Sequence, residues 1–127
     1  MEALDIGAVV KSMPGMAMTP KSTTKESAAA FRMVAKLNDC PVFVVKFSGE
    51  PPWERHPTGD ELLYVLEGEI EIIILTGDGM KSHAVQAGSA FVVPKNVWHR
   101  QVPRPSVTLL SATPRTETSS EIPSLSG

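Results

Sequence analysis

Between Phe31 and Ala112 the chain alternates short runs of apolar and β-branched residues with clusters of turn-forming residues. Such runs are typical of strands, and this stretch lacks the 3.6-residue apolar period of an amphipathic helix. The runs predict strands over residues 31–36, 42–47, 61–66, 69–75, 83–86, 90–93, 99–102 and 107–111, with turns over 48–52, 67–68, 77–79, 87–88 and 94–96. Many short strands at this spacing indicate an all-β sandwich or barrel rather than a fold of alternating strands and helices.

Alternation within the strands assigns their faces, because successive side chains of a strand point to opposite sides. In the run EIEIIIL, Glu69 and Glu71 share one face and the first isoleucines share the other. The runs 62–66 and 42–45 are apolar on both faces, which a barrel with a solvated exterior does not require. Part of the outer face is therefore covered, either by a second copy of the chain or by a terminal segment of the same chain. We expect the second copy, and thus a homodimer.

The two ends of the chain do not continue this pattern. Residues 14–30 have no steady apolar period, and residues 113–127 are rich in Ser, Thr and Pro. The apolar start over residues 4–10 fits either a helical turn or an edge strand that docks on a neighbour. We expect one domain with a β-barrel over residues 31–112 and loosely ordered extensions on both sides, of which the first, residues 1–30, can dock on a dimer partner.

Composition excludes several classes of partner. The chain has 127 residues with 12 basic and 14 acidic side chains and no cluster of Lys and Arg that could follow a phosphate backbone, so we expect no nucleic-acid partner. The first residues, MEALDIGAVV, carry acidic groups where a signal peptide has basic ones, and no apolar stretch approaches the length of a bilayer span. These features predict a cytoplasmic protein that does not associate with membranes. The single cysteine, Cys40, is best explained as a small buried hydrophobe.

The stretch WERHPTGDE brings three side chains that can hold a metal close together, Glu54, His56 and Glu61. If an extended segment leads into the strand that begins at Glu61, Glu54 and His56 point to the same side. A second histidine of interest, His99, ends the stretch GSAFVVPKNVWH at the start of another expected strand. The proline-containing turn before it returns the chain so that His99 enters the barrel.

These two blocks resemble the two sequence motifs of the cupin superfamily. The residues in register are His56, Glu61 and Gly68 for the first motif, and Gly88, Pro94 and His99 for the second. The resemblance spans roughly residues 40–112 and is most similar to the small single-domain cupins of the cupin-2 and RmlC-like type. It implies a jelly-roll β-barrel, often dimeric, with a divalent metal held inside by three histidines and one glutamate.

The chain departs from the cupin pattern within both motifs. Glu54 stands where the family has its first histidine, so the implied ligand set becomes Glu54, His56, Glu61 and His99. Asn96 replaces a glycine, which is a mild change because asparagine tolerates positive φ. Pro103 stands where the second motif ends in asparagine, and this removes a side chain that often shapes the pocket.

The donor types narrow the choice of metal. His56, Glu61 and His99 form a set of two histidines and one carboxylate that suits Fe(II) with open positions for substrate and oxygen. Glu54 can close a fourth position, and a second carboxylate favours Mn²⁺, Fe²⁺ or Zn²⁺ over Cu(I), with Ni²⁺ as a further candidate. Alternatively, Glu54 is a catalytic general base beside a metal-bound water.

A metal is also the best source of positive charge for this site. Two carboxylates that share a buried site without a cation repel each other, and alternation points Arg55 and Arg100 away from it.

Two function classes stay open. The first is a metal-dependent enzyme of dioxygenase, decarboxylase or isomerase type that acts on a small molecule. The second is a non-catalytic ligand-binding or sensor protein, with or without metal, because this fold hosts many unrelated functions.

Overall fold

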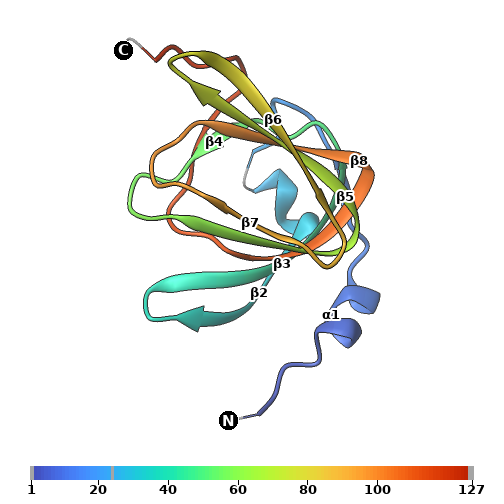
Figure 1. Ribbon diagram of the computed structural model, residues 1–127. Coiled ribbons are helices and arrows are strands. Elements are labelled where there is room, and N and C mark those ends of the chain that lie inside the picture. Colours follow the sequence, from blue (N-terminus) through green and yellow to red (C-terminus); the bar gives the residue numbers. More distant parts are fainter. Residues whose placement is uncertain (1, 24, 126–127) are drawn as a thin grey trace.

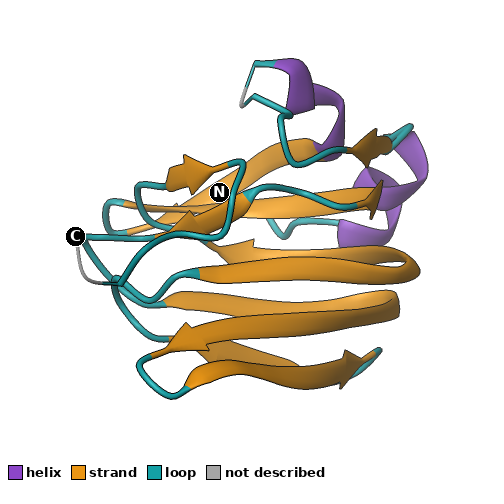
Figure 2. Cartoon of the chain, turned by 90° about the horizontal axis from the view of Figure 1, so that it is seen from above, coloured by secondary structure: helices purple, strands orange, loops and turns teal. Residues whose placement is uncertain are grey.

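The computed structural model describes residues 2–23 and 25–125 (Figure 1). Its strands are β1 (Met16–Met18), β2 (Phe31–Leu37), β3 (Cys40–Gly49), β4 (Trp53–Arg55), β5 (Glu61–Thr76), β6 (Gly79–Gln86), β7 (Ala90–Val93), β8 (His99–Ala112) and β9 (Glu117–Ser119). Its helices are α1 (Ile6–Ser12) and the 3₁₀ helix η1 (Glu26–Ala30). Within the described ranges, neither helix has the length and apolar character that crossing a bilayer requires. The strands curl around a central space, which confirms the predicted all-β fold (Figures 1 and 2).

Strand β8 is the central strand of the sheet and pairs with β3, β4 and β5. Its residues 106–112 pair antiparallel with β3, its first residue pairs with β4, and it pairs with β5 along most of its length. On its other edge, β5 pairs with β7 through residues 61–64 and with β6 through residues 69–76. Because the sheet curls, the start of β5 and the start of β8 face each other across the interior, although the two strands run in opposite directions.

Strand β5 is continuous where the sequence predicts two strands with a turn between them, and β8 is continuous where it predicts two separate strands, 99–102 and 107–111. The predicted turn over residues 67–68 is wrong. Gly68 instead adopts a φ of 79° inside β5, and the pairing with β8 shifts register on both sides of it. A β-carbon on Gly68 would lie 2.3 Å from the carbonyl oxygen of Ser106, so the bulge that bends the strand here requires glycine.

The bulge also changes which residues of β5 face the core. Before it, the odd-numbered residues Leu63 and Val65 are at most 1% exposed; after it, the even-numbered residues Ile70 and Ile72 are fully buried. They pack in one cluster with residues of the facing strands. Burying each side chain of this size contributes about 1.5–3 kcal/mol, so the bulge keeps both halves of the strand in the core.

Helix α1 packs on the outer face of the sheet. Asp5 caps its first turn by accepting a hydrogen bond from a backbone N–H at 3.0 Å. Val10 of α1 and Met13, which follows it, are buried against Val44 of β3. The sequence left open whether residues 4–10 form a helix or a strand, and most of them belong to this helix. A terminal segment of the same chain therefore covers part of the outer face.

Another part of the outer face stays apolar and exposed. Leu62 and Tyr64 of β5 are 43% and 39% exposed, and Val92 of the neighbouring β7 is 54% exposed. These positions alternate with buried ones, as period-two patterning requires. A homodimer that covers this patch remains a prediction.

Loosely ordered extensions at both ends remain a prediction, and within the described residues a short segment of each extension contacts the barrel. The 3₁₀ helix η1 contacts β1, β2 and β3, and its Ser27 and Ala30 are buried. At the other end, β9 pairs with β4, and Glu117 Oε1 accepts a hydrogen bond from Arg55 Nε at 2.7 Å. These contacts are made by single residues with strands that are distant in sequence. An apolar period in the sequence therefore cannot predict them.

Candidate metal centre

The four side chains predicted as metal ligands meet inside the barrel. Glu54 comes from β4, His56 follows that strand, and Glu61 and His99 are the first residues of β5 and β8. One donor atom of each lies within 4.8 Å of the others. His56, Glu61 and His99 are at most 2% exposed, whereas the side chain of Glu54 is 23% exposed. The structure therefore brings the four residues together and leaves Glu54 at the edge of the cluster.

Glu61 lies at the centre of this cluster. Its Oε1 is 3.2 Å from His56 Nε2 and 3.3 Å from His99 Nε2. Its Oε2 accepts a hydrogen bond from Thr113 Oγ1 at 2.6 Å. Oε1 of Glu54 lies 3.4 Å from His99 Nε2. The hydroxyl of Thr113 thus holds Oε2 of Glu61, and Oε1 faces the two imidazole rings.

The hydrogen bond of His99 fixes its tautomer. His99 Nδ1 lies 3.0 Å from the carbonyl oxygen of Val97. A carbonyl oxygen only accepts, so Nδ1 carries the proton of this bond. When the ring is neutral, Nε2 therefore presents a lone pair toward Glu54 and Glu61.

His56 is oriented in the same way by a different partner. Its Nδ1 lies 3.1 Å from Thr116 Oγ1, and that hydroxyl donates its own hydrogen to the carbonyl oxygen of Pro114. The hydroxyl must then accept from Nδ1–H, because it has only one hydrogen to donate. When the ring is neutral, the buried His56 Nε2 therefore aims a lone pair into the cluster and finds no donor there; when the ring is protonated, Nε2 pairs with Glu61 Oε1, 3.2 Å away. Buried polar atoms are rarely left unpaired, and a cation is the partner that suits this lone pair.

The charges of the cluster shift its acid–base equilibria. Burial alone would lower the pKa of His99, but hydrogen bonds and charge from Glu54 and Glu61 raise it to about 10. Burial would raise the pKa of Glu61, but His56 and His99 outweigh it and lower that pKa to about 2. The pKa of His56 is raised, because the carboxylate of Glu61 outweighs the effect of burial. A cation that binds here displaces histidine protons, so its affinity falls as the pH is lowered.

Three polar residues at the site were missed in the sequence. Gln101 donates from Nε2 to Oε1 of Glu54 at 2.9 Å and to Oε1 of Glu61 at 3.2 Å, while Thr113 and Thr116 support Glu61 and His56. Alternation could have identified Gln101, because it stands two residues after His99 and shares its face of the strand. The sequence carries no comparable signal for the two threonines, since they follow β8 in a segment without strand patterning.

The neighbouring arginines do not neutralise the glutamates. Arg55 forms its ion pair with Glu117, and its guanidinium carbon lies 4.7 Å from the centre of the Trp98 ring. The guanidinium carbon of Arg100 lies 5.2 Å from the centre of the Trp53 ring. Positive charge at the centre therefore comes from protonated histidine or from a bound cation. The donor set of two imidazole nitrogens and two carboxylate oxygens fits a first-row divalent metal.

A cavity of about 350 Å³ opens beside the cluster. Glu54, Glu61 and Gln101 line it, together with apolar residues of the barrel and residues from both chain ends. Its volume lies near the lower end of the range of about 300–1,000 Å³ that is typical of small-molecule sites. The cluster therefore borders a space that can hold a ligand.

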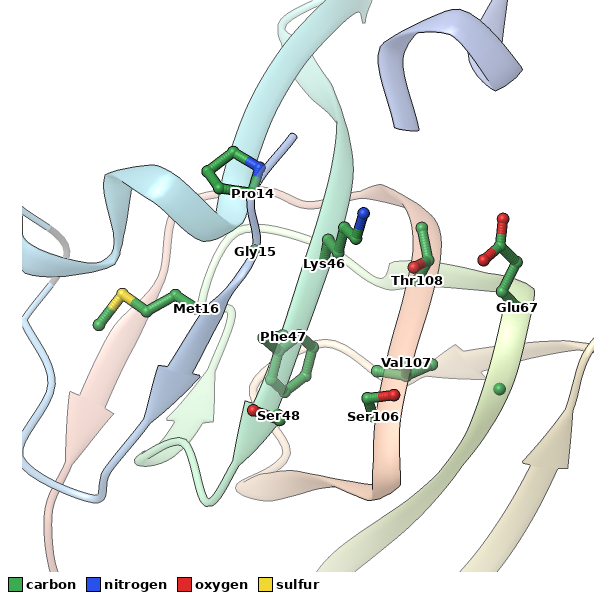
Figure 3. A pocket seen from close by; sticks show the side chains of 11 residues that line it. Pro14, Gly15, Met16, Lys46, Phe47, Ser48, Glu67, Ser106, Val107 and Thr108 are labelled. Carbon is green, nitrogen blue, oxygen red and sulfur yellow. The ribbon is translucent and has the colours of Figure 1, made fainter. Parts of the chain in front are cut away.

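A second cavity, of about 300 Å³, lies where β1, β3, β5 and β8 approach one another, and Lys46, Glu67 and Thr108 are among its lining residues (Figure 3). Lys46 Nζ donates to the carbonyl oxygens of Val10 and Met13, at 3.4 and 3.0 Å. Its ammonium group thus stabilises the end of α1 rather than a ligand. The four cluster residues are not among the described residues that line this cavity.

Comparison with known proteins identifies the family. The family sequence model of the cupin domain matches residues 41–102 of this chain, which include His56, Glu61 and His99. The chain belongs to the cupin superfamily. A solved cupin-2 domain protein from Shewanella frigidimarina is 28% identical, with a TM-score of 0.57, and the alignment covers 69% of this cupin and 78% of that chain.

Other relatives of this cupin are longer than the region they share with it. The uncharacterised protein YdbB of Bacillus subtilis is 34% identical over 76 residues, which are 60% of this cupin and 64% of YdbB. The cupin spans less than two thirds of the length of the curated relatives it matches. Oxalate oxidase, solved in complex with the substrate analogue glycolate, is 27% identical with a TM-score of 0.50, over 65% of this cupin and 43% of that chain.

Proposed function

We propose that this cupin binds a divalent transition metal, Fe, Mn, Zn or Ni, through His56, Glu61 and His99, and that it is a small-molecule enzyme. The observation that carries the metal assignment is the convergence of one donor atom each from Glu54, His56, Glu61 and His99 within 4.8 Å, where the buried His56 Nε2 lies 3.2 Å from a carboxylate oxygen that it can pair with only when its ring is protonated. The hydrogen bonds of Val97 and Thr116 to the two histidines further support it, because they direct both Nε2 lone pairs into the cluster.

The role of Glu54 follows from its place between the cluster and the cavity. A metal bound at this site would supply Lewis-acid activation of a substrate or water oxygen. Glu54 lines the cavity, and Gln101 holds its Oε1 by a hydrogen bond of 2.9 Å. We assign Glu54 as the general base that accepts a proton from the substrate in the cavity. The reaction is of dioxygenase, decarboxylase or isomerase type, and the relation to oxalate oxidase supports chemistry on a small molecule.

One observation favours a second function. A carboxylate oxygen of Glu54 is close enough to the other donors to serve as a fourth metal ligand. For Zn²⁺, four protein ligands complete a tetrahedral structural site, whereas a catalytic zinc keeps one position open. With Glu54 as a ligand, this cupin would bind a small molecule or sense it without transforming it.

Metal analysis tests the ligand assignment. We expect the untagged protein, purified without chelator, to hold near one equivalent of metal per chain, and His99→Ala to hold almost none while keeping its circular dichroism spectrum. His83→Ala is the matched control, because His83 is an exposed histidine of β6 outside the cluster. A wild-type protein that takes up no added Fe, Mn, Zn or Ni, or equal metal in His99→Ala, contradicts the assignment.

Water relaxation in the Mn²⁺-loaded protein distinguishes the two roles of Glu54. If Glu54 is a base, the metal keeps open positions, solvent water exchanges onto it, and Glu54→Gln leaves both metal content and proton relaxation rate unchanged. If Glu54 is a ligand, six-coordinate Mn²⁺ has one position fewer for solvent water in the wild type than in Glu54→Gln, so the variant shows a lower metal affinity and a higher relaxation rate. The second pattern would refute the role as a base.

The remaining expectations about the cellular context stay proposals. We infer a homodimer from the apolar patch of Leu62, Tyr64 and Val92, and we propose a cytoplasmic location. A net charge of −2 gives no support for a nucleic-acid partner, and we propose a small molecule as the partner of the cavity.

A further inference from the structure

The cavity beside the cluster has two ends of different chemistry. Glu54, Glu61 and Gln101 form a polar end. Much of the remaining wall is apolar and includes Phe31, Phe43, Val45, Leu63 and Leu109. Phe31 and Phe43 pack edge to face, with ring centres 6.0 Å apart and an angle of 84° between the rings. This polarity orients a ligand, because its polar group is placed at the glutamates and its apolar part at the phenylalanines.

The wall offers no positive charge away from the polar end. Of the described residues that line the cavity, none is a lysine or an arginine. The arginines nearest in sequence to the cluster, Arg55 and Arg100, stack on tryptophan rings, and Lys46 is bound to the end of α1. Hydroxyl groups such as those of Ser27 and Thr118 also line the cavity and can donate hydrogen bonds, but they do not neutralise an anion. A charged group placed among the phenylalanines would lose part of its hydration without gaining a counter-ion, and this costs free energy although Phe31 itself is 40% exposed.

The net charge of the polar end also restricts which ligands the cavity attracts. Glu54 and Glu61 together contribute −2, and a divalent cation contributes +2, so the loaded centre has a net charge of zero when its histidines are neutral. A centre with three histidines and one glutamate would instead carry +1. The second carboxylate therefore removes the net attraction that such a centre would offer to an anionic substrate.

We propose that the cavity selects small molecules with one oxygen-bearing head group and an uncharged, apolar body about the size of an aromatic ring, and that it discriminates against molecules with a second anionic group. This inference rests on the proposed function, since the head group is expected to bind at the metal end. It separates this cupin from its relative oxalate oxidase in substrate class, because oxalate carries two carboxylates and no apolar body.

A matched pair of compounds tests this selectivity. The probes are 3-phenylpropanoate and 3-(4-carboxyphenyl)propanoate, which differ only by the second carboxylate at the far end of the ring. Isothermal titration calorimetry measures both with metal-loaded and with metal-free protein, and metal content is determined on the same samples. We expect the monocarboxylate to bind the loaded protein at least about tenfold more tightly, because the second carboxylate is desolvated without a counter-ion.

Three variants isolate the cause of the selectivity. Phe31→Lys places a positive charge at the cavity wall, and because Phe31 is 40% exposed, the variant is expected to fold. In this variant, the ratio of the dissociation constants of the dicarboxylate and the monocarboxylate should fall by about tenfold, since the new ammonium pairs with the second carboxylate. Phe31→Leu removes the ring without adding charge and should keep the preference. Leu37→Lys adds the same charge near the tip of the β2–β3 hairpin, which projects away from the barrel in Figure 1, and should also keep it.

The outcomes separate this inference from the metal assignment. Equal or tighter binding of the dicarboxylate to metal-loaded wild-type protein overturns the selectivity while leaving the metal site intact. Failure of the monocarboxylate to bind loaded protein at millimolar concentration also overturns it. Protein that takes up no metal contradicts the proposed function. In that case the metal-free titrations still decide whether the cavity discriminates against the second carboxylate.

Discussion

The metal-free protein should lose stability as the pH rises from 6.5 toward 10, because of His99. The pKa of His99 is raised from its usual 6.5 to about 10 in the folded state, since Glu54 and Glu61 hold its proton. The folded protein therefore binds this proton more tightly than the unfolded chain does. The resulting stabilisation is fully present below pH 6.5 and disappears as the pH rises through the folded pKa.

The magnitude follows from the difference between the two pKa values. A pKa that rises from 6.5 to about 10 corresponds to a free energy on the order of 5 kcal/mol, at about 1.4 kcal/mol per pH unit. The fully buried position of His99 leaves little solvent to screen the charges. By pH 8 about 2 kcal/mol of this free energy of unfolding should be lost, which is a large share of a typical domain stability of about 5–15 kcal/mol.

Urea denaturation of chelator-treated protein at pH 6.5, 8 and 9.5 measures the effect, with His99→Gln as the reference. The variant shares the other titrating groups, so the difference in free energy of unfolding between the two proteins reports His99. We expect the wild type to lose its advantage over the variant as the pH rises. Parallel curves over this range, or a wild type that gains stability relative to the variant, would refute the reasoning. Metal-loaded wild type should lack this slope, because the metal takes the place of the proton.

Three further predictions test residues around the centre and in the fold. Thr113→Val removes the hydroxyl that donates to buried Glu61 at 2.6 Å, and should lower the free energy of unfolding by about 1.5–3 kcal/mol in chemical denaturation, while Thr113→Ser restores most of it. Gly68→Ala forces a β-carbon toward a carbonyl oxygen at positive φ and should cost more than about 2 kcal/mol, whereas Gly77→Ala, with open space around it, should cost far less; equal losses would contradict the bulge. Val10→Ala should lower the melting temperature through lost packing of α1 on the sheet, and an unchanged value would show that the helix does not stabilise the barrel.

Much of the barrel could be predicted because its strands alternate clearly. The expected starts of the strands at Glu61 and His99 agree with β5 and β8. The bulge at Gly68 was misread as a turn, since a glycine between two apolar runs gives the same local signal in both cases. Only the close approach of β8 distinguishes them, and that contact is not visible in one stretch of sequence.

The four residues of the cluster could be predicted more easily than the residues that hydrogen-bond to them. Glu54 and His56 stand two residues apart on an extended segment, so a local rule places them on one face. The same rule places Gln101 on the face of His99, but an amide is not a usual metal ligand, so the residue type alone does not indicate a role at the site. Thr113 and Thr116 reach the site through the path of the chain after β8, which no local pattern determines.

The pairing of Glu54 with His99 has a consequence for how the barrel is assembled. Strand β4 has only three residues, and it meets β8 at this pair. A slip of one residue between them would turn either Glu54 and His56 or His99 and Gln101 to the opposite face of the sheet. A chain in the wrong register would then lack the donors that converge inside the barrel. Metal uptake would therefore report correct strand alignment, and an ion present during refolding should select chains that have paired β4 and β8 in the native register.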